Sequence, residues 1–144
     1  MKYITQKSAL YISSLVLLLA GLLDIIRGIA HTFRVRHAAE NFAKIEINSD
    51  NLVLMSAFGI SNFLTGFIYF LIVWKANKIV PYVLALIPLS YFLGGIGMRY
   101  SNVVMESEFR GQHMMSIYIK VCFFTALYYF IASYIEKKRK VSYE

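Results

Sequence analysis

Hydrophobic residues in this chain gather into four long stretches that are separated by shorter polar connections. At about 1.5 Å of rise per residue, each stretch is long enough to cross the roughly 30 Å hydrocarbon layer of a membrane as an α-helix. Transmembrane β-strands would instead be shorter and would alternate apolar with polar residues. The pattern therefore predicts an all-α integral membrane protein with four transmembrane helices in an up-down-up-down bundle. The predicted helices are 8–31, 52–75, 79–99 and 112–135.

The connections between these helices define a single membrane domain that covers residues 1–144. The second and third helices are joined by a tight turn, whereas the connections 32–50 and 100–111 are longer and are predicted to be external loops. The first of these loops either prolongs the first helix or lies as an amphipathic segment at the membrane surface. Residues 136–144 are predicted to form a solvated, basic cytoplasmic tail.

Lysine and arginine are distributed unevenly between the two ends of the predicted helices. In multi-pass membrane proteins, the short loops with more lysine and arginine face the cytoplasm. The distribution predicts a multi-pass protein of the cell inner membrane with both termini cytoplasmic. The net charge of +7 then lies mostly beside anionic lipid head groups, so membrane lipids are expected partners and a nucleic acid is not. The eight basic residues of the predicted cytoplasmic face are Lys2, Lys7, Lys75, Lys78, Lys137, Lys138, Arg139 and Lys140.

Ionisable side chains interrupt the apolar pattern where the first predicted helix ends. They follow one another at spacings of three, four and three residues, so they share one face of a helix. A charged side chain at the bilayer centre costs about 2.5–3.5 kcal/mol on insertion scales, and such groups usually face protein or a water-filled cavity. The stripe therefore predicts a site inside the bundle. Its members are Asp24, Arg27, His31 and Arg34.

The other predicted helices bring polar residues to the same depth, so the four helices are expected to converge on one polar layer. This layer contains one acid, Asp24, and three cations, which are Arg27, Arg99 and Lys120. We expect a salt bridge from Asp24 to Arg27 or to Lys120. The remaining cations need water, the membrane surface or a bound anion, and a carboxylate or phosphate head on an apolar tail would supply that anion. The expected ligand-binding residues are Asp24, Arg27, His31, Asn62, Tyr91, Arg99, His113 and Lys120.

Three hypotheses for function follow from this layer. In the first, the protein binds a small amphiphile or lipid with an anionic head in an outward-facing polar pocket. In the second, it is a membrane enzyme in which Asp24 or His31 transfers a proton on a lipophilic substrate. In the third, it is a non-enzymatic interaction subunit, and the polar layer fixes the register of the helices beside a second copy or a partner membrane protein.

Cofactor and nucleophile chemistry find little support in the sequence. The single cysteine, Cys122, lies in the apolar fourth helix, where it is expected to act as a small buried hydrophobic residue. The chain contains no phosphate-binding loop, nucleophile elbow or zinc-protease helix. We therefore expect neither a metal nor a cofactor. The alternative is a haem that His31 and His113 hold between two facing helices.

Glycines are spaced along the first three predicted helices. In lipid, small residues let two helices approach closely, and the same residues also leave volume that widens a pocket. These positions therefore predict where helices touch or where a cavity opens. They are Gly21, Gly28, Gly59, Gly66, Gly94, Gly95 and Gly97.

The end of the first predicted helix has the sequence Arg27-Gly28-Ile29-Ala30-His31-Thr32. With its Gly-x-x-His-Thr signature and the four-helix layout, the chain resembles small bacterial four-helix integral membrane proteins of unknown function. The resemblance implies the fold and the membrane location, and it implies no activity.

Overall fold

The computed structural model describes residues 5–103 and 111–141, and within these ranges the chain is helical, with no β-strand. Four of its helices are long and apolar enough to cross a membrane, which confirms the predicted all-helical architecture and its four candidate spans. The α-helices are α1 (Gln6–Phe33), α2 (Val35–Ala38), α3 (Ser49–Lys75), α4 (Val80–Tyr100) and α5 (Gly111–Val141). A π-helical turn, Ala39–Ala43, follows α2, and a 3₁₀ turn, Asn77–Ile79, precedes α4.

Side-chain caps begin two of the helices earlier than the apolar runs suggest. Thr5 Oγ1 accepts a hydrogen bond from the backbone N–H of Ser8 at 3.2 Å, and Ser8 Oγ accepts one from the Thr5 N–H at 3.3 Å. This reciprocal capping box starts α1. In the same way, Asn48 Oδ1 accepts a hydrogen bond from the Asn51 N–H at 2.8 Å, so α3 begins directly after Asn48.

The connection predicted as external loop 32–50 is largely helical. It contains the last residues of α1, then α2 and the π-helical turn, and its Ala38 and Ala39 are completely buried. Lys44 adopts a left-handed backbone conformation, with φ of 53°, and ends this helical segment. Of the predicted loop 100–111, residues 104–110 lie outside the described residues.

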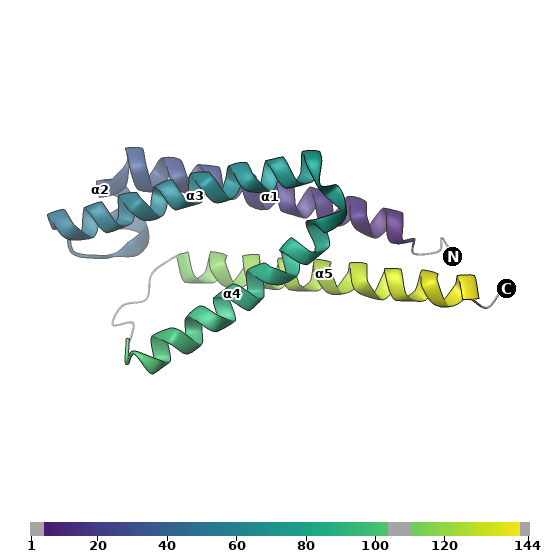
Figure 1. Cartoon of the computed structure of the whole chain (residues 1–144). Helices are drawn as coiled ribbons and strands as arrows, with labels where there is room; N and C mark the ends of the chain where they lie inside the picture. The colour runs from purple at the N-terminus through teal and green to yellow at the C-terminus, as the bar shows by residue number, and fades with distance from the viewer. Residues whose placement is uncertain (1–4, 104–110, 142–144) are drawn as a thin grey trace.

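The last helix continues beyond the start of the predicted tail at 136, because α5 stays helical to Val141. Glu136 explains this extension. Its Oε2 accepts a hydrogen bond from the backbone N–H of Gln6 at 2.8 Å, and its Oε1 pairs with Lys140 Nζ at 3.5 Å, one turn further along the helix. Gln6 Nε2 also donates to the hydroxyl of Tyr129 at 2.9 Å. The start of α1 and the end of α5 are therefore tied together, and Figure 1 shows both termini at this end of the molecule.

Helices α1 and α3 lie side by side along most of their length (Figure 1), and glycines mark the places where they touch. A Cβ atom on Gly66 would lie 2.8 Å from the carbonyl oxygen of Gly21, and one on Gly28 would lie 2.9 Å from the ring of Phe63. Later residues of α1 thus meet earlier residues of α3, so the two helices run antiparallel. The predicted close approach at glycine is confirmed for this pair of helices.

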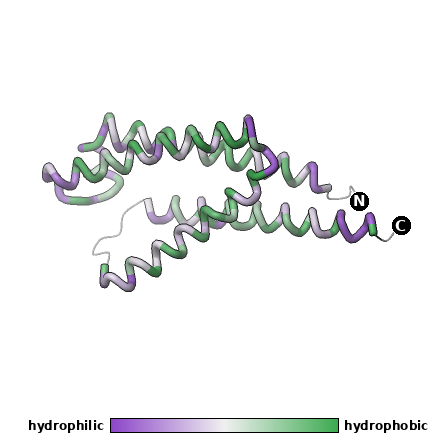
Figure 2. Tube along the Cα trace, in the orientation of Figure 1, coloured by the Kyte–Doolittle hydropathy of each residue, from purple (hydrophilic) through white to green (hydrophobic). Residues whose placement is uncertain are grey.

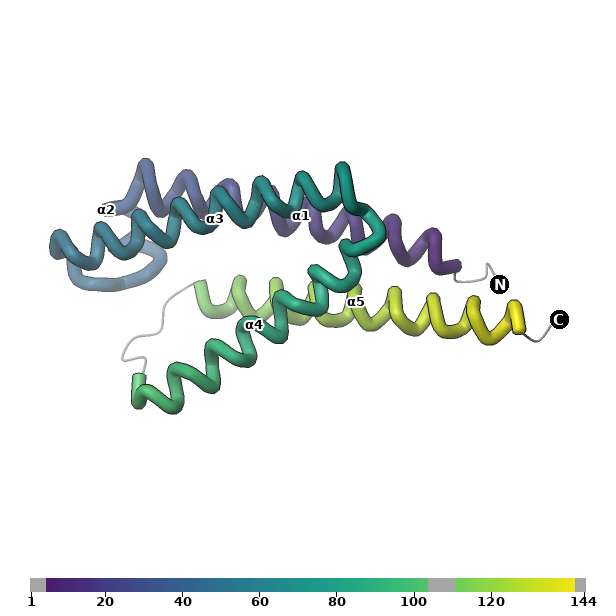
Figure 3. The backbone as a smooth tube through the Cα atoms, in the orientation of Figure 1, coloured from purple at the N-terminus to yellow at the C-terminus, as the bar shows by residue number. Residues whose placement is uncertain are grey.

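Helix α4 is packed at its start and stands away from the other helices at its end (Figure 3). Val80 and Leu84 are completely buried, and they share a core with Leu17 of α1 and Cys122 of α5. Toward its end the helix diverges from α5. Pro88 lies inside the helix, directly after Ile87, the last of its buried residues. A Cβ atom on any of the three glycines of this half would have no atom within 4 Å. The glycines at 94, 95 and 97 therefore make no close helix contact within the described part of the chain.

Apolar residues predominate along the four long helices (Figure 2). Large hydrophobic side chains on each of them are more than half exposed, for example those of Leu19, Leu64, Phe92 and Phe124. Water-soluble monomers rarely expose contiguous apolar surface on this scale, whereas a protein surrounded by lipid does so by necessity. The surface therefore agrees with a multi-pass membrane protein.

Candidate functional site

A cavity of about 300 Å³ opens between α3 and α4, and we call it the polar cleft. All four long helices contribute to its lining. Three residues expected from the sequence, Asp24, Asn62 and Tyr91, are brought together here from α1, α3 and α4. Two further tyrosines, Tyr69 of α3 and Tyr118 of α5, complete its polar lining together with smaller hydroxyl groups of α3 and α4.

Asp24 and Arg27 form an ion pair at the α1 side of the cleft. Asp24 is only 4% exposed, and Arg27 Nη1 donates to its Oδ1 at 3.4 Å. The pair joins positions i and i+3 of one helix, so the fold of α1 alone brings the two groups together. The Arg27 guanidinium also lies over the ring of Tyr118, 5.4 Å from its centroid, in a cation–π arrangement. Of the two salt bridges expected for Asp24, the structure contains the one to Arg27.

A second cavity, of about 360 Å³, adjoins this ion pair, and we call it the apolar chamber. Arg27 and His31 of α1 contribute to its lining, whereas Asp24 lines only the polar cleft. Phe58 lines both cavities. Asp24 therefore faces the polar cleft, whereas Arg27 faces the apolar chamber and a further cavity of about 310 Å³ between α1 and α5. The remaining lining of the chamber is apolar and includes Phe42, Met55, Met114 and Met115.

His31 is held beside the chamber by contacts with α3. Its ring lies 5.4 Å from the ring of Phe58, and its Nδ1 is 3.5 Å from the amide nitrogen of Asn62. Next to it, the hydroxyl of Thr32 is buried and has no hydrogen-bond partner within the described residues. This hydroxyl faces Gly59, where an added Cβ atom would collide with it. The close packing of α1 on α3 thus fixes the position of the imidazole.

Tyr69 and Tyr118 line the cleft in addition to the binding residues that were expected from the sequence. Each of these tyrosines is only 9% exposed. Tyr69 lies two helical turns after Asn62 on the same face of α3, which is a signal that the sequence contains. Tyr118 has no comparable signal, because a tyrosine within an apolar run is equally expected to pack against lipid.

Three of the expected site residues, Arg99, His113 and Lys120, are exposed and line neither cavity. Lys120 is two positions after Tyr118, which turns it by about 200° around the helix axis, away from the inward face of α5. Arg99 lies on the diverging half of α4, and His113 lies in the first turn of α5. The expected excess of cations is therefore not assembled around the ion pair, and Arg27 is the arginine that lines the chamber.

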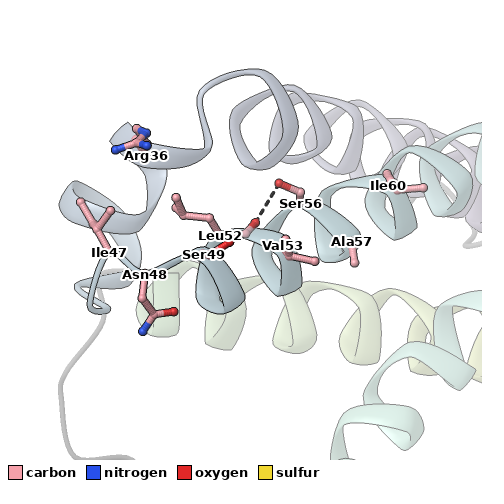
Figure 4. Close-up of a pocket in the computed structure, with 9 residues that line it drawn as sticks. All are labelled: Arg36, Ile47, Asn48, Ser49, Leu52, Val53, Ser56, Ala57 and Ile60. Atoms are coloured by element: carbon pink, nitrogen blue, oxygen red, sulfur yellow. Dashed lines mark hydrogen bonds between the residues drawn. The ribbon is translucent and has the colours of Figure 1, made fainter.

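A groove of about 540 Å³ follows the first half of α3, and Figure 4 shows the residues that line it. Its sides are the apolar residues Leu52, Val53 and Ile60, and Arg36 of α2 is its charged residue. Ser56, whose hydroxyl donates to the carbonyl oxygen of Leu52 at 2.8 Å, offers no free donor there. The groove contains none of the expected site residues.

Metal ligands are not clustered in the structure. No group of three or more histidine, cysteine, aspartate or glutamate side chains that could hold a metal ion occurs within residues 5–103 and 111–141. Cys122 is buried and makes no disulfide. The comparison of the chain with protein-family models, with curated proteins and with solved structures found no match.

Proposed function

We propose that this protein binds a small amphiphile with an anionic head, which Arg27 receives while the apolar chamber holds the body of the ligand. The observation that carries the proposal is the position of Arg27 at the edge of a cavity whose lining is apolar except for Arg27 and His31. Its guanidinium makes a single 3.4 Å contact with Asp24, so most of its N–H groups are left for a ligand. His31 supplies a second hydrogen-bonding group in the same lining.

The methionines of the chamber support an apolar ligand of variable shape. Met55, Met114 and Met115 come from α3 and α5, and unbranched methionine side chains adapt to irregular bodies. A carboxylate or phosphate head suits Arg27 because guanidinium N–H groups form strong, charge-assisted hydrogen bonds with such anions. A hydrogen bond to a charged group contributes about 1.5–3 kcal/mol, which is about 10- to 100-fold in affinity.

The binding test compares decanoate with decanol, which have the same chain but differ in charge. In a neutral detergent, decanoate is expected to raise the unfolding temperature of the protein at lower concentration than decanol does. The double variant Asp24→Asn/Arg27→Gln removes both charges together, so neither is left unpaired, and it is expected to weaken decanoate binding by about 10- to 100-fold. Met115→Trp, which fills the chamber, is expected to weaken both probes.

Lys120→Gln is the matched control, because it removes a cation from an exposed position of α5 and is expected to leave decanoate binding unchanged. Equal stabilisation by decanoate and decanol would contradict the anionic head. If neither probe stabilises the protein, the interaction-subunit hypothesis is favoured, in which the ion pair is structural. Proton transfer by Asp24 or His31 stays a prediction.

The proposal includes an up-down-up-down bundle in the bacterial inner membrane, with the chamber toward the external side and both termini cytoplasmic. The basic end of α5 supports this orientation, since loops rich in lysine and arginine stay cytoplasmic. The hydrogen bonds from Gln6 to Glu136 and Tyr129 support it as well, because they hold both ends of the chain on one side.

Cysteine labelling tests the orientation. In a Cys122→Ser background, Lys44→Cys is expected to react with a membrane-impermeant maleimide in intact cells, and Lys138→Cys is expected to react only after the membrane is opened. Both lysines are exposed, so access depends on the side of the membrane. The reverse pattern would overturn the proposed orientation.

A further inference from the structure

The charged residue that lines the polar cleft is an acid, Asp24, whereas Arg27 lines the chamber. No lysine, arginine or histidine side chain of the described residues lines the cleft. The Asp24 carboxylate accepts from Arg27 through Oδ1, and no other hydrogen bond reaches this carboxylate from the described residues. A carboxylate held by one 3.4 Å contact has room for a second donor.

The other polar groups of the cleft can accept hydrogen bonds from a ligand. Asn62 turns its amide nitrogen toward His31, which leaves its carbonyl oxygen as an acceptor. The hydroxyl oxygens of Tyr91 and Tyr118 are further acceptors in the same lining. An ammonium group carries three N–H donors and no acceptor, so it matches a cavity whose lining combines one acid with several acceptor groups.

Aromatic rings add a second attraction for the same charge. Tyr69, Tyr91 and Tyr118 line the cleft together with Phe58. The face of an aromatic ring carries negative potential and attracts organic cations, most strongly where water is excluded. Tyr118 already receives the Arg27 guanidinium in this way, 5.4 Å from its centroid.

From this charge and lining we propose that the polar cleft is a second binding site, which takes an amphiphile with a primary ammonium head. The head lies against Asp24 among the tyrosines, and the apolar chain lies along Val83, Leu86 and Ile87 of α4. This site goes beyond the proposed function, because its ligand has the opposite charge and occupies the other cavity. Its binding does not depend on a ligand in the chamber.

The test uses decylammonium, with decyltrimethylammonium and decanol as comparisons of equal chain length. Decylammonium is expected to stabilise the protein at about tenfold lower concentration than decanol, because only the cation pairs with Asp24. Decyltrimethylammonium, which has no N–H donor, is expected to bind less tightly than decylammonium. Tyr91→Leu is expected to weaken decylammonium by about three- to tenfold and to leave decanoate unaffected, since Tyr91 lines the cleft but not the chamber.

Controls separate this site from the chamber. Tyr100→Leu makes the same change on the same helix at a residue that is 90% exposed and lines neither cavity, so both probes are expected to bind as before. Met115→Trp is expected to weaken decanoate but not decylammonium.

The proposal is overturned if decylammonium stabilises no better than decanol, or if Tyr91→Leu folds normally and binds decylammonium unchanged. It is also overturned if Met115→Trp weakens both charged probes equally, because that result indicates one site. Tighter binding of decyltrimethylammonium would overturn the primary ammonium assignment.

Discussion

Replacing Asp24 with alanine is expected to lower the free energy of unfolding by about 3 kcal/mol, because Arg27 then loses its counter-charge inside the bundle. The side chain of Asp24 is 6% exposed and that of Arg27 is 22% exposed, so water compensates the orphaned guanidinium only in part. Reversible unfolding in mixed detergent micelles, followed by circular dichroism, measures the loss.

The double variant Asp24→Ala/Arg27→Met gives the matched comparison. It is expected to be more stable than Asp24→Ala alone, because replacing both members of a buried pair by apolar groups leaves no uncompensated charge. Lys120→Ala is the exposed control, with an expected change within about 0.5 kcal/mol. The single variant Arg27→Met completes the comparison. If the effects of Asp24→Ala and Arg27→Met simply add in the double variant, the two side chains have no interaction energy.

Gly66→Ala is expected to destabilise the protein by about 1–3 kcal/mol, although alanine is the better helix former. The added Cβ would lie 2.8 Å from the carbonyl oxygen of Gly21 and 2.9 Å from the side chain of Ile25. The carbonyl belongs to the backbone of α1, so it moves only if the two helices separate. The same unfolding experiment measures this loss.

Gly95→Ala is the matched substitution in α4, where a Cβ atom meets nothing within 4 Å. It is expected to be neutral or to stabilise the helix by up to about 1 kcal/mol, through the higher helix propensity of alanine. Equal losses at Gly66 and Gly95 would show that the contact between α1 and α3 does not determine the effect.

The sequence predicts the helices of this protein better than it predicts their rotation. Long apolar runs identify four helices because length and hydropathy are properties of each segment alone. The ion pair of Asp24 and Arg27 is predictable for a similar reason, since both residues belong to one helix. The placement of Lys120 is not predictable in this way, because the face that α5 turns inward depends on what packs beside Tyr118 and Cys122.

The glycines illustrate the same limit. Gly66 and Gly95 both predict a close approach or an open space, and the structure contains one of each. Gly66 belongs to α3, which lies beside α1 along most of its length, whereas Gly95 belongs to the half of α4 that diverges. Spacing along a helix specifies a face, and only the arrangement of the other helices decides what that face meets.

Because only the start of α4 is packed, a small rotation of the helix about its start would move its far end by several times more. Its packed start is held by the core around Leu84 and, just before the helix, by the hydrogen bond that Asn77 Nδ2 donates to Ser14 Oγ at 2.7 Å. Arg99 lies about 22 Å further along the axis, so a rotation of about 10° at the start displaces that end by about 4 Å. Pro88 weakens the helix between these two points, since it cannot donate the backbone hydrogen bond of its turn. Such a rotation would change the spacing between α3 and α4 most at the far end of α4 and least beside Val83 and Leu86, which line the polar cleft near the packed start.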